Sequence, residues 1–306
     1  MAKLKTERHH WWPRSLSQFW ANEQGCVHWL RPSGEVVVSP PGNFGMIGNG
    51  HHVLLGDPGQ PTIWDSSFEA DFQRADDNFP AVIEWLRGLD HCTHAAGTQL
   101  VDRFIPATVP DVELAVLMEG LISLAVRSPM NREAAVGVAE LLRGPLPERE
   151  RNRLIAVNMK NTHRDAVKQL GIRGKFVALY SPDKEFIFGD GFYHTIRSPL
   201  NATSSPTILA PLTPHLAALF VRPMAYTSDP RFFTLVVSAE ETKTLNHAVQ
   251  VYARDKLFYR SEEPAIDDAY TEGKHLMYDG PVNPINKLVQ SIPGVQTPNR
   301  HTFAFW

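Results

Sequence analysis

The segment from residue 110 to 128, PDVELAVLMEGLISLAVRS, is the feature that most constrains the fold. Its apolar residues fall on nearly all sides of a helix, so a helix here must be covered by other elements. Asp111 after Pro110 favours a helix start, and Pro129 ends the helix. The stretch is short and is interrupted by Glu119, so we expect a buried core helix and not a membrane span.

The pattern around this helix changes along the chain. Further helices are expected before and after it, and from residue 175 onward short apolar runs separated by turn residues predict strands. This order predicts an α+β fold, with a helical middle and a mainly antiparallel sheet built from hairpin strands in the second half. The expected helices cover 79–89, 131–144 (with Asn131 as N-cap and Gly144 after the C-terminus), 148–171 and 239–259, and the expected hairpins cover 27–38 and 175–193.

Length and composition are those of an ordinary globular protein. The chain has 306 residues, 43% of them hydrophobic, which is ample for one large core. We expect a single domain over 1–306, with 263–306 as a C-terminal extension packed on it. The net charge of -3 predicts no global basic field for nucleic acid. Two cysteines and the lack of an apolar run after the charged start predict a cytoplasmic protein without a secretory signal or membrane partner.

Several enzyme classes are excluded by missing motifs. The sequence has no G-x-x-x-x-G-K-[ST], no G-x-G-x-x-G opening a helix, no G-x-S-x-G, no H-E-x-x-H and no paired C-x-x-C. His91, Cys92 and His94 have a superficially metal-like spacing, but without a second pair we interpret them as a loop or helix end.

The segment 8–20, RHHWWPRSLSQFW, is too aromatic for a disordered leader and is expected to be packed. In one interpretation, the imidazole of His9 or His10 is a metal ligand or a general base. Only one of the two would have this role, because neighbouring side chains on a strand point to opposite sides. The other reading is a structural histidine, hydrogen-bonded at the start of the helix that follows Pro13.

Asp190 follows an apolar strand and stands between Gly189 and Gly191, which allow close approach of a ligand. A carboxylate there suits a metal ligand or a base, since a rigid sheet fixes its position. The alternative is a carboxylate that hydrogen-bonds the amides of its own turn. His194, four residues later, can join either arrangement.

Arg127 ends the apolar helix, where its charge either complements the helix C-terminus or directs an anion-binding fork into a cleft. Asn246 lies on the last predicted helix beside the apolar stripe, a position that usually belongs to a solvated face.

The order of these motifs resembles a widespread, mainly bacterial family of domains of unknown function. That family opens with H-H-x-x-P-x-x-x-L-x-x-F and then carries R-T-P, S-D-x-P and P-L-S/T-P motifs. The resemblance spans about residues 8–260. The chain departs from it by one residue fewer between Pro13 and Leu16 in the first motif, by Ser128 in the second and by Gly189 and Phe192 in the third. The corresponding segments here are HHWWPRSLSQF, RSP at 127–129, GDGF at 189–192 and PLTP at 211–214.

The resemblance implies no established reaction, but it implies that the motif residues converge on one polar site. His9, His10, Asp190 and Arg127 would be catalytic, His10 and Asp190 would hold a divalent metal ion, and Asn246 and His194 would bind ligand. Such a set suits a hydrolase acting on an anionic small molecule or nucleic acid, such as a metal-dependent nuclease or phosphodiesterase.

Two other readings stay open. The same groups can form a non-catalytic domain that binds an anionic ligand or a partner. They can also form a structural network that ties the N-terminus to the sheet.

Overall fold

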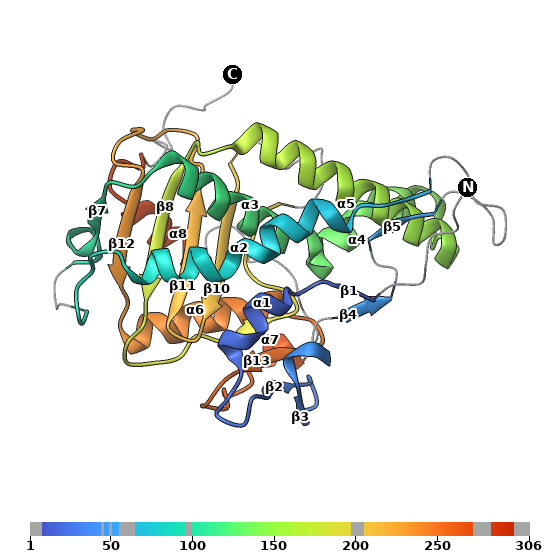
Figure 1. Ribbon diagram of the computed structural model, residues 1–306, viewed down its shortest axis with the longest axis horizontal. Helices are drawn as coiled ribbons and strands as arrows, with labels where there is room; N and C mark the ends of the chain where they lie inside the picture. The colour runs from blue at the N-terminus through green and yellow to red at the C-terminus, as the bar shows by residue number, and fades with distance from the viewer. Residues whose placement is uncertain are drawn as a thin grey trace, which may run out of the picture.

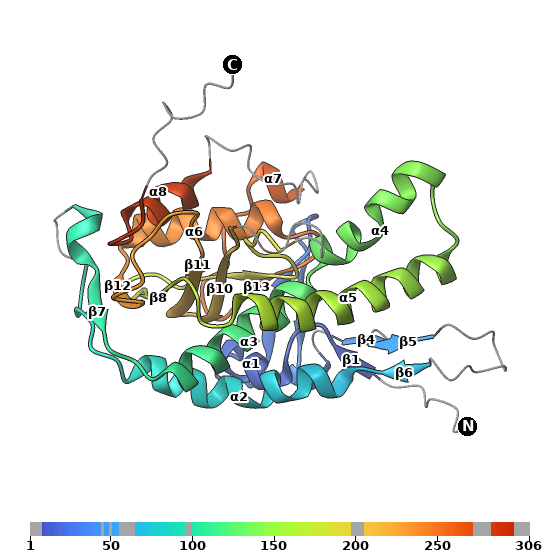
Figure 2. The ribbon, with the colours of Figure 1, turned by 90° about the horizontal axis from the view of Figure 1, so that it is seen from above.

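The computed structural model describes residues 8–43, 46–48, 51–54, 65–95, 99–196, 205–271 and 283–296, and of residues 8–10, 43 and 46–48 it describes only the backbone. The chain has an α+β fold, as the order of elements predicted. A five-stranded sheet lies between two layers of helices (Figures 1 and 2).

The large sheet has the strand order β10-β11-β8-β12-β7, and its pairs are antiparallel except for the parallel pair β8–β12. Its three central strands are buried at every residue, because helices cover both faces of the sheet. The strands are β7 (Ile105–Ala107), β8 (Lys175–Tyr180), β10 (Thr207–Thr213), β11 (Leu216–Val221) and β12 (Phe232–Val236).

Helices α2, α3 and α5 lie on one side of this sheet, and α6 and α8 lie on the other (Figure 2). Helix α3 is buried along most of its length, so the predicted core helix is confirmed. The helices are α1 (Arg14–Ser17), α2 (Glu69–Arg87), α3 (Asp111–Arg127), α4 (Pro129–Arg143), α5 (Glu148–Leu170), α6 (Ala239–Tyr252), α7 (Asp268–Thr271) and α8 (Pro284–Ser291), with 3-10 turns η1 (Gln18–Trp20), η2 (Pro41–Asn43) and η3 (Leu100–Arg103).

A second, smaller sheet joins segments from both ends of the chain in the order β3-β2-β13-β9. The predicted hairpin over 27–38 is confirmed, since β2 and β3 pair directly. Its strands are β2 (Val27–Leu30), β3 (Val36–Ser39), β9 (Phe188–Gly189) and β13 (Leu257–Tyr259); two further pairs join β1 (Arg8–His10) to β4 (Met46–Gly48) and β5 (His52–Val53) to β6 (Ser66–Ser67).

The predicted hairpin over 175–193 is wrong, because β8 and β9 belong to different sheets. Strand β8 is apolar on both faces and takes a central place between β11 and β12, while β9 pairs with β13 after α6. The turn between them therefore connects two sheets, and it brings Asp190 beside the loop that follows α6.

The junction of α3 and α4 sets the direction of both helices. Ser128 has an extended backbone, as the residue before a proline prefers, and its hydroxyl accepts a hydrogen bond from the Asn131 backbone N–H. Pro129 takes the first helical position, which needs no amide donor. The N-cap of α4 is thus Ser128 and not Asn131, whose side chain instead donates to the Val126 carbonyl at 2.8 Å.

Candidate functional site

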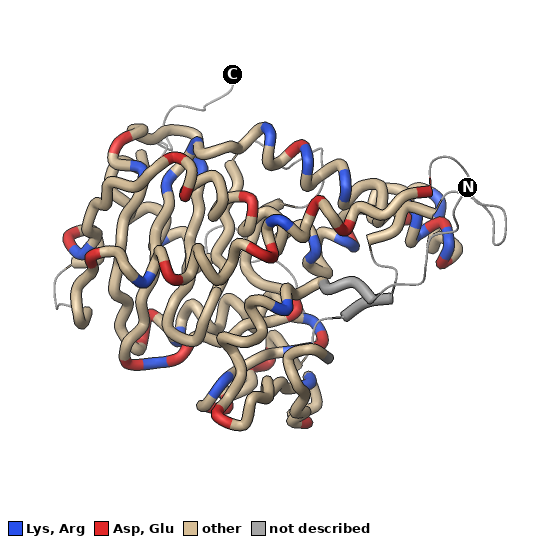
Figure 3. Tube along the Cα trace, viewed as in Figure 1, with Lys and Arg blue, Asp and Glu red and all other residues tan. Residues whose placement is uncertain are grey.

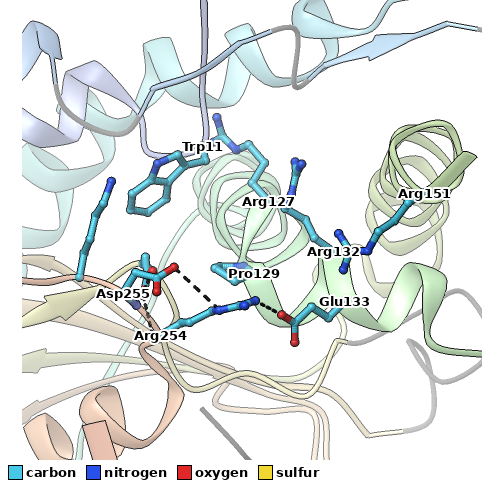
Figure 4. A pocket seen from close by; sticks show the side chains of 10 residues that line it. Trp11, Arg127, Pro129, Arg132, Glu133, Arg151, Arg254 and Asp255 are labelled. Atoms are coloured by element: carbon cyan, nitrogen blue, oxygen red, sulfur yellow. Dashed lines mark hydrogen bonds and ion pairs between the residues drawn. The ribbon is translucent and has the colours of Figure 1, made fainter. Parts of the chain in front are cut away.

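A cavity of about 260 Å³ opens beside the α3–α4 junction. It lies between α4, the start of α5, the end of β9 and the loop after α6, and the residue after β1 forms part of its wall (Figure 4). This is somewhat smaller than a drug-sized pocket and suits a small metabolite. The lining residues are Trp11, Arg127, Pro129, Arg132, Glu133, Arg151, Asp190, Arg254, Asp255 and Lys256.

Arg132 and Arg151 form the cationic side of this cavity. Arg132 stands on the first turns of α4 and Arg151 on those of α5, and in Figure 4 both side chains lie on the same side of the space. Burial lowers the pKa of the Arg132 guanidinium, and the nearby charge of Arg151 lowers it further. Arg151 binds Glu140 through Nε at 3.1 Å, whereas within the described part of the chain Arg132 has no acidic partner. Of these two neighbouring guanidinium groups, only Arg151 is paired with a carboxylate.

Two more cations border the cavity from the loop after α6. Arg254 forms an ion pair with Glu133 of α4, so this pair spans 121 residues of sequence. Lys256 places its ammonium group 5.1 Å from the ring centre of Trp29, where a cation is attracted to the aromatic face.

Asp190 forms part of the acidic side of the cavity and is 6% exposed. Its Oδ1 accepts the backbone N–H groups of Gly191 at 3.0 Å and Arg254 at 2.7 Å, and its Oδ2 accepts that of Asp255 at 2.9 Å. Burial raises the pKa of the Asp190 carboxyl and the Asp255 charge adds to this, while the three donors oppose it. One of these three donors, Gly191, belongs to the turn of Asp190 itself, as one of the two alternatives predicted, and the other two belong to the loop after α6. The same carboxylate also borders the cavity.

The glycines beside Asp190 permit this close packing. A Cβ on Gly191 would lie 1.9 Å from the Tyr252 carbonyl oxygen, and one on Gly189 would lie 2.5 Å from the Gly191 carbonyl oxygen. Both contacts are with backbone, so a larger residue at 191 would push the turn away from the end of α6, and one at 189 would distort the turn around Asp190. In this structure the glycines serve chain packing.

Arg127 also borders the cavity, but its guanidinium is engaged with protein groups. It binds both carboxylate oxygens of Asp76 on α2, at 2.6 and 2.9 Å, and its Nε donates to the Ser123 carbonyl at 3.1 Å. Its guanidinium also lies 4.9 Å from the ring centre of Phe72. The Arg127 guanidinium, predicted as one alternative to bind an anion in a cleft, therefore binds a carboxylate of this chain, Asp76.

Asn246 and His194 do not line this cavity, so the structure does not bring them together with Arg127 and Asp190 there, and the ligand-binding roles predicted for them stay predictions. The Asn246 side chain accepts from the Ile187 N–H and donates to the Glu185 carbonyl, both at 3.0 Å, which ties α6 to the segment before β9. The His194 Nε2 lies 2.7 Å from the Ser128 hydroxyl, against the N-cap of α4. Both side chains are buried by packing between elements that the sequence pattern could not place.

The side chains of His9 and His10 lie outside the described residues, so the roles predicted for them stay predictions. The backbone of both belongs to β1, which pairs with β4, and Trp11 directly after it lines the cavity. Among the side chains that the structure describes, no group of three His, Cys, Asp or Glu could hold a metal ion. His91 stacks on the ring of Tyr180 with centres 3.8 Å apart, so part of the HCTH segment packs on the protein.

The sequence analysis missed six charged residues that line the cavity: Arg132, Glu133, Arg151, Arg254, Asp255 and Lys256. Arg151 belongs to the charged run ERERNR, which is typical of a solvated helix face, and Arg132 follows the RSP motif by only three residues. The short distance in sequence between Arg132 and the RSP motif is the feature that could have indicated a place for Arg132 in the site. Figure 3 shows basic and acidic positions interspersed along the helices in that view, so charge alone did not mark these residues.

No helix in the described ranges is long and apolar enough to cross a lipid bilayer. Comparison with protein-family models, with curated proteins and with solved structures gave no match to this chain. The resemblance to a family of unknown function stays a prediction, and functional inference depends on the cavity itself.

Proposed function

We propose that the cavity binds a small anionic ligand and that the protein acts through this binding. The observation that carries the proposal is Arg132, a half-buried guanidinium beside Arg151 with no acidic partner among the described residues. An anion between the two groups would remove their repulsion and accept charge-assisted hydrogen bonds from both. Arginine forks suit phosphate and carboxylate groups because their donors are planar and fixed.

Binding of phosphate and sulfate to the full-length protein tests this proposal. Either anion is expected to raise the melting temperature and to give a saturable calorimetric signal. Arg132→Gln removes the charge and is expected to weaken binding at least tenfold, because a hydrogen bond to a charged group contributes about 1.5–3 kcal/mol. Arg164→Gln is the matched control, since Arg164 is an exposed arginine of α5 that does not line the cavity.

Two results would refute the anion site. One is the absence of any stabilisation or heat at anion concentrations on the order of 10 mM, a range that captures even millimolar dissociation constants. The other is equal weakening by Arg132→Gln and Arg164→Gln, which would assign the effect to overall charge.

A hydrolase acting on an anionic substrate is the second candidate, and the position of Asp190 favours it. A buried carboxyl with a raised pKa faces the same cavity as the cations, a combination that suits a general base beside groups that stabilise negative charge. The predicted metal-dependent form, a nuclease or phosphodiesterase, needs further ligands such as His10 beside Asp190.

Turnover of bis(4-nitrophenyl) phosphate and of a short single-stranded oligonucleotide tests the hydrolase, with Mg²⁺ or Mn²⁺ and again after EDTA. A catalytic Asp190 predicts a loss of about 100-fold or more in Asp190→Asn, judged only if phosphate binding shows that the variant is folded. Loss of turnover after EDTA supports the metal-dependent form. Phosphate binding without turnover of either substrate would refute the hydrolase and support the non-catalytic binding domain.

A further inference from the structure

The cavity has a pair of guanidinium groups on one side and a pair of carboxylates on the other. The carboxylate side also holds Arg254, which is paired with Glu133, and Lys256, whose ammonium group lies over the ring of Trp29. Arg132 and Arg151 lie on one side, while Trp11 and Asp255 lie on the other (Figure 4). Asp190 lies beside Asp255, to whose backbone N–H its carboxylate binds. We propose that the ligand is a small zwitterion, with its anionic group between Arg132 and Arg151 and its ammonium group beside Asp190. This inference rests on the anion site proposed above.

The cationic side needs a negative charge. Neighbouring guanidinium groups repel each other in a half-buried place, and Glu140 neutralises only Arg151. Arg254 is engaged by Glu133, so that pair adds little net charge to the space. An anionic group bound here would meet the Arg132 fork and the terminal nitrogens of Arg151.

The carboxylate side can take up a positive charge, because the two cations beside it are directed elsewhere: Arg254 is paired with Glu133, and the Lys256 ammonium group lies over Trp29. The charge of Asp255 acts on the Asp190 carboxyl, and the Asp255 side chain is 69% exposed, with Arg254 Nε 3.8 Å away. Asp190 Oδ2 accepts one backbone N–H and so keeps acceptor capacity for another donor. The Trp11 indole on the same side can also attract a cation to its face.

A ligand that carries both charges neutralises both like-charge pairs at once. A simple anion would leave the carboxylates together, and a nucleic-acid backbone would bring more negative charge against Asp190 and Asp255. An ammonium group placed there gains hydrogen bonds to charged acceptors. The chemistry of the cavity therefore favours an amine-bearing phosphate or an amino acid over a plain anion of the same size.

A matched pair of probes tests this specificity, with O-phosphoethanolamine and ethyl phosphate titrated into the full-length protein by calorimetry. The two share the phosphate ester and differ by the ammonium group. We expect O-phosphoethanolamine to bind at least tenfold more tightly. Asp255→Asn is expected to reduce this preference to about threefold or less while ethyl phosphate binding is retained or tightened.

Controls separate the failure of this inference from failure of the anion site. Asp183→Asn, in an exposed turn away from the cavity, should keep the full preference. Asp190→Asn should lose the preference as Asp255→Asn does, provided that its melting temperature shows a folded protein. Equal affinity for the two probes in the wild-type protein would refute the proposal of a zwitterionic ligand, while the proposed anion site would still be supported. Binding of neither probe would overturn both.

Discussion

Replacing Asp76 by alanine leaves the Arg127 guanidinium buried without its carboxylate. Arg127 is 1% exposed and makes two short contacts with Asp76, at 2.6 and 2.9 Å. Removing one partner of a buried ion pair typically costs about 3–5 kcal/mol, because the remaining charge stays away from water. Since Asp76 itself is 17% exposed, water can reach its place, and we expect a loss near the lower limit, about 3 kcal/mol.

Urea unfolding followed by circular dichroism measures this loss. The midpoint should fall without a change in the m-value, and the melting temperature should fall by about 5 °C. Glu84→Ala on the same helix is the control, because Glu84 and Arg87 form a pair of similar length, 2.9 Å, with 69% and 47% of their side chains exposed. That variant should lose no more than about 0.5 kcal/mol.

A loss below about 1 kcal/mol in Asp76→Ala would refute the reasoning, because it would make this pair equivalent to a surface salt bridge. The double variant Asp76→Leu and Arg127→Met gives a second check. Replacing both charges by apolar groups should restore much of the stability that the single change removes. If the double variant also keeps its phosphate affinity, Arg127 positions α3 against α2 and is not a ligand group.

Three further predictions concern other parts of the fold. Burial lowers the pKa of His163 to about 4, so the unfolded chain binds the extra proton between about pH 6.5 and 4. The free energy of unfolding should fall by up to about 3 kcal/mol as pH drops through this window, and His163→Gln should flatten the slope; an equal slope would contradict the assignment. Gly191→Ala places a Cβ 1.9 Å from the Tyr252 carbonyl oxygen, so it should lower the free energy of unfolding by about 2 kcal/mol or more and weaken phosphate binding. Gly137→Ala meets nothing within 4 Å and should stabilise α4 by about 0.5–1 kcal/mol. Chemical denaturation compares the two variants, and equal effects on stability would refute the packing argument. Asn246→Ala leaves buried backbone groups unpaired, so it should lower the free energy of unfolding by about 1–3 kcal/mol without changing phosphate affinity. If calorimetry showed a loss of phosphate affinity in this variant, the ligand-binding role predicted for Asn246 would be supported.

The sequence by itself determined the elements whose causes are local. Helix α3 follows from apolar residues at every turn between two prolines, and the β2–β3 hairpin follows from two apolar runs around a Pro-Ser-Gly turn. The succession of helices and then strands was sufficient to predict the α+β class. The motif segments also indicated Arg127 and Asp190, which the structure brings to one cavity.

Only the tertiary structure decided what these side chains contact. Arg127 meets Asp76 from 51 residues earlier, and Asp190 meets the amide groups of the loop that begins 64 residues later. Strand β8 leaves its expected hairpin partner because a strand that is apolar on both faces is buried best between two others. Arg132 and Arg151 look like ordinary helix-surface charges in sequence, and they become neighbours because α4 and α5 pack as an antiparallel pair. Contacts between such distant positions depend on how layers stack, and no local pattern encodes that arrangement.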